Sequence, residues 1–222
     1  MALTPWTREN VVNRAINTLD WFGYYMTKDR SDGGTAMYGI RYVHWNSATN
    51  SPELGSGTLI ASDCSAFASW CWNLPERETT STLYDMFRDR LVAKAANTGN
   101  AETDFPGINL GDLLIRRGSH VAVYIGAQQT AEMHTSTWPK SGNGQGGSIR
   151  RWDAYSNYTH YIPFDNEYSK DYDDENPDYN PWEGGEQPNP PYDPSDSTPG
   201  IWMATWGLQY TKRYLNMKHW RM

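Results

Sequence analysis

The sequence predicts an α+β domain in which N-terminal helices pack on an antiparallel sheet. Apolar residues recur at helical spacing in the first part of the chain, as at Val11, Ala15 and Leu19. From residue 113 onwards the chain instead contains short apolar runs separated by glycine-containing turns, a pattern typical of antiparallel neighbours. Its 222 residues are enough for one ordinary domain with additional segments.

The expected elements follow from periodicity and from cap and turn residues. Helices are expected at residues 7–26 with Thr7 as N-cap, at residues 64–71 after a cap at Ser62 or Asp63, and at residues 81–96. Strands are expected at residues 113–115, 120–126, 130–136, 148–152 and 158–163, with a strand or extended segment at 37–45. Turn residues fill positions 46–57, which are expected to form a loop.

Composition divides the chain into three parts. Residues 1–164 contain the expected helices and strands and form the candidate catalytic domain. Residues 165–199 hold eleven acidic residues against one lysine, with interspersed proline, and are expected to be a linker or a surface strap. Residues 200–222 are aromatic and basic. They are expected either to complete the domain or to bind a cell wall or another partner.

Charge and cysteine content exclude several classes of protein. A net charge of −7 leaves no broad basic face for phosphates, which argues against nucleic acid as the main partner. The sequence has no apolar run long enough for a membrane span, and its polar start has no apolar signal core. Seven helical residues separate Cys64 from Cys71 by about 10.5 Å, too far for a disulfide. Two isolated thiols predict neither a metal site nor a cofactor.

Cys64 is the candidate nucleophile. At the first turn of a helix it faces the positive end of the helix dipole, which is expected to lower its thiol pKa. His120 begins a strand after a Gly-Ser turn and is a candidate base for that thiol. On the following strand Glu132 and His134 share one face by the period of two, and either could orient the His120 ring.

Four motifs in order carry a family resemblance. They are Asp63-Cys64-Ser65, the turn and strand at residues 111–114, the strand and its approach at residues 119–126, and residues 133–136. Together they resemble the NlpC family of cell-wall cysteine peptidases, over about residues 8–163. The resemblance implies a papain-like core with Cys64 as nucleophile, His120 as base and His134 as orienting residue. The related CHAP amidases (cysteine, histidine-dependent amidohydrolase/peptidases) leave Glu132 as a rival for that last role.

The substrate side of the site is expected to include Tyr38, Asp63, Ser65 and Glu132. Two positions depart from the family pattern: Ala66 stands where glycine is usual, and the gap between Tyr38 and Cys64 is long.

The resemblance implies a peptidoglycan hydrolase that cleaves a stem-peptide or sugar–peptide amide bond without a cofactor. The lack of a signal core fits a bacteriophage endolysin that stays in the host cytoplasm before release to the cell wall, or a virion-associated lysin. One alternative is a non-catalytic virion structural or adhesion protein that keeps the fold. Another is an acyltransferase with the same thiol chemistry.

Overall fold

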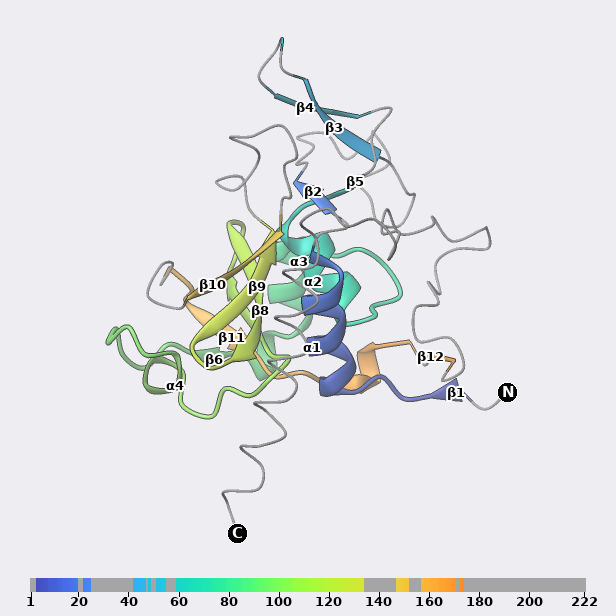
Figure 1. The fold of residues 1–222 in the computed structure, drawn as a ribbon. Helices are drawn as coiled ribbons and strands as arrows, with labels where there is room; N and C mark the ends of the chain where they lie inside the picture. The colour runs from blue at the N-terminus through green and yellow to red at the C-terminus, as the bar shows by residue number, and fades with distance from the viewer. Residues whose placement is uncertain are drawn as a thin grey trace. The chain divides into compact units, whose positions relative to one another are not determined.

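The computed structural model describes residues 3–19, 22–24, 42–46, 48, 51–54, 59–133, 147–151, 157–170 and 172–173. All of them belong to one compact unit, Met1–Gln187. Residues 200–222, which are expected either to complete the domain or to bind a partner, lie outside the described ranges. The described part is a mixed α+β structure with an antiparallel sheet, as the sequence predicts (Figure 1).

The main sheet has the strand order β10-β9-β8-β7-β11-β6. Its strands are β6 (Val92–Ala93), β7 (Leu113–Arg116), β8 (His120–Gly126), β9 (Gln129–Met133), β10 (Gly147–Arg151) and β11 (His160–Ile162). Every pair of neighbours is antiparallel. Helices α1 (Arg8–Asn17) and α2 (Cys64–Cys71) pack against β8 and β9 (Figure 1).

Alternate residues of β8 belong to two different cores. Val121 and Val123 pack in the core that contains the buried side chains of α1 and α2. Ala122 and Tyr124 pack in a second core with Phe105, which follows the short helix α4 (Ala101–Asp104). Successive strand residues point to opposite faces, so apolar residues at both parities place a core on each face of β8.

A second sheet leads the chain into α2. Its strands are β2 (Phe22–Tyr24), β3 (Tyr42–Asn46), β4 (Ser51–Leu54) and β5 (Leu59–Ser62), in the order β2-β5-β3-β4. β2 pairs with β5 in parallel, with Tyr24 opposite Ser62. Because Ser62 is followed by the first residues of α2, this register carries Tyr24 to the beginning of that helix.

Three predicted elements need correction. The first helix ends at Asn17, not at residue 26, because Phe22–Tyr24 pairs with β5. The helix expected at 81–96 is α3 (Thr80–Met86), followed by the 3-10 turn Arg88–Arg90 and by β6. The expected loop at 46–57 contains β4, whose hydrogen-bonding partner is β3. In each case strand pairing outweighs the local pattern: β2 and β6 pair with distant strands, and β4 pairs with its neighbour β3.

The Gly111–Asp112 turn ties several parts of the domain together. Gly111 has a φ of +81°, which favours glycine, and it lies against Val11 and the Arg8 carbonyl of α1. The buried Asp112 carboxylate binds the Arg8 guanidinium and accepts hydrogen bonds from the backbone N–H groups of Asn109 (2.7 Å) and Phe164 (2.9 Å). The turn therefore joins the first helix, the main sheet and the end of the predicted catalytic region.

The beginning of the acidic segment lies along the domain. Arg90 forms an ion pair with Asp165 at its start. Further along, the Lys170 N–H donates to the Asn73 carbonyl (2.8 Å), and the Asn73 side-chain amide donates to the Lys170 carbonyl (2.7 Å). Strand β12 (Tyr172–Asp173) then pairs with β1 (Leu3–Thr4). The described part of this segment is therefore a strap attached to the domain.

Replacing Asp112 by alanine is expected to destabilise the fold by about 2–4 kcal/mol, because the Arg8 guanidinium and the N–H groups of Asn109 and Phe164 all lose their acceptor. Denaturant unfolding of the purified protein measures this. The matched control is Asp85→Ala, which removes an exposed carboxylate paired with Arg88 and Arg117 and should change stability little. Equal effects of the two substitutions would contradict the role given to Asp112.

Candidate active site

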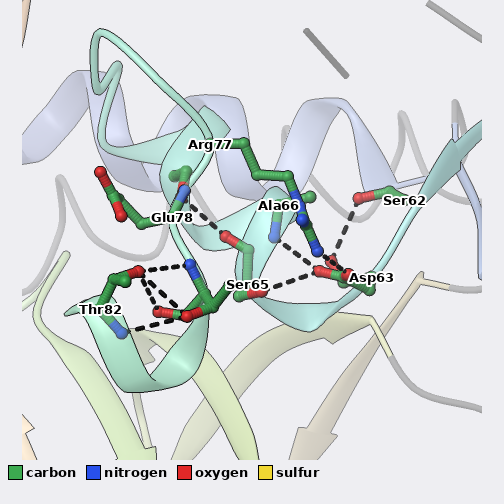
Figure 2. A network of polar contacts seen from close by, with 9 residues as sticks. Ser62, Asp63, Ser65, Ala66, Arg77, Glu78 and Thr82 are labelled. Carbon is green, nitrogen blue, oxygen red and sulfur yellow. Dashed lines mark hydrogen bonds and ion pairs between the residues drawn. The ribbon is translucent and has the colours of Figure 1, made fainter. Parts of the chain in front are cut away.

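Cys64 is the first residue of α2, and Asp63 is its N-cap. One oxygen of the Asp63 carboxylate, Oδ1, accepts hydrogen bonds from the Ala66 backbone N–H (2.8 Å) and the Ser65 hydroxyl (2.9 Å) (Figure 2). Asp63 and Ser65 are both buried. Their side chains thus hold the start of the helix, and the substrate contact expected of them stays a prediction.

The Cys64 thiol is 8% exposed and is surrounded by backbone donors. Hydrogen bonds from the N–H groups of Val121, Ser65 and Cys64 itself favour a negative sulfur, as the helix-start position predicts. Burial outweighs them, however, and together with the Asp63 charge it raises the pKa of Cys64 to about 12. The expectation of a lowered pKa is therefore wrong for the protein without substrate.

His120 begins β8, one residue before the Val121 N–H that faces the thiol. Its Nε2 atom is hydrogen-bonded to Oε2 of Glu132, which lies on β9 and is fully buried. The Thr130 hydroxyl donates to the other carboxylate oxygen (3.2 Å), and the Tyr158 hydroxyl donates to Oε2 (3.4 Å). The Tyr158 ring also stacks on the imidazole, with ring centroids 5.9 Å apart. Glu132 and Tyr158 together fix the plane of the His120 ring.

The contact between Glu132 and His120 is one of the two that the strand periodicity anticipates. His134, the other candidate for orienting His120, lies outside the described residues, as does Tyr38. Glu132 was also expected on the substrate side, but its carboxylate is directed at His120 and Thr130. Its place in the structure is that of a partner for the imidazole.

Tyr24 is a site residue that the sequence reasoning missed. Burial and the nearby charges of Cys64 and Asp63 raise the pKa of its phenol well above the ordinary value. The hydroxyl is therefore neutral at physiological pH and lies close to the thiol. Gly23 and Tyr24 lie within the helix that the sequence predicts at residues 7–26, and only the pairing of β2 with β5 brings Tyr24 to Cys64.

The described residues give no sign of a metal site or a membrane span, and comparison with known proteins does not assign a function. Within the described ranges, no three His, Cys, Asp or Glu side chains gather as a metal site. No helix there is both long and apolar enough to cross a membrane. Comparisons with models of protein families, with curated proteins and with solved structures gave no match. Function is therefore inferred from the residues and their geometry.

Alkylation of Cys64 by iodoacetamide is expected to be slow at neutral pH and to keep rising above pH 9. The folded-state pKa of about 12 exceeds the ordinary 9.0, so at pH 8 the thiolate fraction is about a thousandfold lower than in an unburied thiol. A Cys71→Ala background restricts labelling to Cys64, and the rate is followed by mass spectrometry. A rate that levels off near pH 7 would contradict the burial argument.

Proposed function

We propose that the protein is a cysteine peptidase or amidase with a papain-like core of the NlpC type, and that it cleaves an amide bond in peptidoglycan. The proposal rests on the arrangement of Cys64, His120 and Glu132. The thiol of Cys64, at the start of α2, accepts a hydrogen bond from the backbone of β8 next to His120, and a buried glutamate holds that histidine. A nucleophile, a base and an orienting acid from three separate elements are the parts that thiol catalysis requires.

In this mechanism His120 activates the thiol as it attacks. Because Glu132 holds Nε2, the opposite ring nitrogen, Nδ1, takes the proton from Cys64 while sulfur bonds to the carbonyl carbon of the scissile amide. The Glu132 carboxylate stabilises the imidazolium that forms. His120 then protonates the leaving amine, and water hydrolyses the thioester. The raised pKa of Cys64 favours proton transfer during attack over a thiolate that exists beforehand.

The proposed substrate class rests on the resemblance of the four ordered motifs to the NlpC family. The proposed bond is an amide within the stem peptide or between sugar and peptide, and the proposed source is a bacteriophage endolysin or virion-associated lysin. Binding of a wall or virion partner through residues 200–222 belongs to the same proposal and is supported by composition alone.

A second candidate is a non-catalytic virion structural or adhesion protein that keeps this fold. The burial of Cys64 and its raised pKa favour it, because an inert thiol needs no ionised form. Such a protein would bind purified walls without releasing fragments, so the test of the hydrolase also separates the two candidates.

Cys64→Ala is expected to abolish the release of soluble muropeptides from purified cell walls, because no other group supplies the nucleophile. Mass spectrometry of the fragments measures the release and identifies the bond. Cys71→Ala, which removes the fully buried thiol two turns further along α2, is the matched control and should retain activity. Digestion that persists in Cys64→Ala would refute the mechanism.

Glu132→Gln is expected to reduce the hydrolysis rate by about a hundredfold or more, since a neutral amide neither fixes the ring tautomer nor stabilises the imidazolium. The substitution keeps the volume of the side chain, and a melting curve checks that the fold is retained. Glu102→Gln, at an acid that accepts a hydrogen bond from Tyr124, is the control. Full activity of Glu132→Gln would leave His120 without the partner assigned to it.

A further inference from the structure

A buried ion pair lies directly beside the candidate nucleophile. Nη2 of Arg77 donates to Oδ2 of Asp63, the carboxylate oxygen that the helix cap does not use (Figure 2). Both side chains are largely shielded, with 7% of Asp63 and 18% of Arg77 exposed. Because Asp63 precedes Cys64 in the chain, any uncompensated charge on its carboxylate acts on the thiol at short range.

The loop after α2 holds Arg77 in this position. The backbone N–H of Glu78 donates to the Ser69 hydroxyl (3.0 Å), which in turn donates to the Ser65 carbonyl (2.8 Å). This contact fixes the chain next to Arg77 against the helix that carries Cys64. The packing of this loop against α2 therefore places the guanidinium next to Asp63.

Stability alone does not explain an arginine at this position. Within the described part of the structure, Nε of Arg77 is buried without a hydrogen-bond partner. A buried donor without a partner costs free energy, and a buried ion pair is often no more stabilising than apolar residues of similar volume. A need for a positive charge beside the Asp63 carboxylate explains the arginine better than packing does.

The charged and titratable groups around the thiol come from several elements. Asp63 lies at the start of the same helix, and Tyr24 comes from β2. His120, which is bound to Glu132, directly precedes Val121, whose N–H is hydrogen-bonded to the sulfur. The Asp63 charge raises the pKa of Cys64, and Tyr24 stays neutral because its own pKa is raised. The Arg77 guanidinium, bound to Oδ2 of Asp63, is placed to offset this charge.

We propose that Arg77 is a positioning residue that neutralises the Asp63 carboxylate and thereby allows the Cys64 sulfur to become negatively charged. The inference rests on the proposed role of Cys64 as nucleophile. It assigns to Asp63 and Arg77 a joint electrostatic function in addition to capping α2. The substrate does not contact Arg77 in this account, since the guanidinium acts through Asp63.

The test is a charge-removal cycle read by alkylation of Cys64 in the full chain, in a Cys71→Ala background, between pH 7 and pH 10. Arg77→Met is expected to slow labelling about tenfold at pH 8, which corresponds to a rise of about one unit in the pKa of Cys64. Arg77→Lys keeps the charge and should restore most of the rate. Asp63→Asn keeps a good N-cap and should label faster than the parent.

The double variant Asp63→Asn/Arg77→Met is expected to label close to the parent rate, because both charges are gone. Arg88→Met, at an exposed arginine paired with Asp85, is the matched control and should not move the pH profile. Melting curves identify any variant that fails to fold. If Arg77→Met unfolds, the comparison of Arg77→Lys and Asp63→Asn with the parent still decides.

Unchanged profiles in Arg77→Met and Asp63→Asn would overturn the inference, even if Arg77→Met lowers the melting temperature. That result would mean that the ion pair contributes to the fold but not to the charge state of Cys64. Failure of the proposed function has a different signature: walls would stay undigested by the parent while the alkylation rate still depended on Arg77.

Discussion

The carboxylate of Asp63 connects the fold of this protein to its candidate chemistry. One of its oxygens caps α2 through Ala66 and Ser65, and the other binds Arg77. Because Cys64 follows directly, the interaction that starts the helix also sets the charge beside the thiol. An N-cap could have been serine or threonine at little cost to the helix, but only an acid creates a need for Arg77.

Burial and reactivity oppose each other at Cys64. The side chain belongs to the core that α1 and α2 form against the main sheet, and its exclusion from water raises the pKa of the thiol to about 12. Three backbone N–H groups point at the same sulfur and act in the opposite direction. Under the proposed mechanism, such a thiol is neutral at rest and loses its proton to the base during attack.

Both cores that pack against the main sheet contribute to the candidate site. Val121 and Val123 of β8 pack in the core with α1 and with α2, the helix that carries Cys64. His120, the first residue of β8, is stacked by Tyr158 of the second core and bound to Glu132. The second core therefore also has a part in the candidate site, because it contains Tyr158, which stacks on the His120 ring.

The sequence by itself determined the α+β class, the helix that starts at Cys64, the strands that follow Gly111 and the pairing of His120 with an acid or histidine on the next strand. These depend on local periodicity, caps and turns, which are visible along the chain. Only the tertiary structure decided that the first helix ends at Asn17 and that Tyr24 lies beside the thiol, since parallel pairing of β2 with β5 is non-local. The ion pair with Arg77 and the raised pKa of Cys64 likewise arise from packing, because burial and charge at a site are sums over side chains that the sequence does not place together.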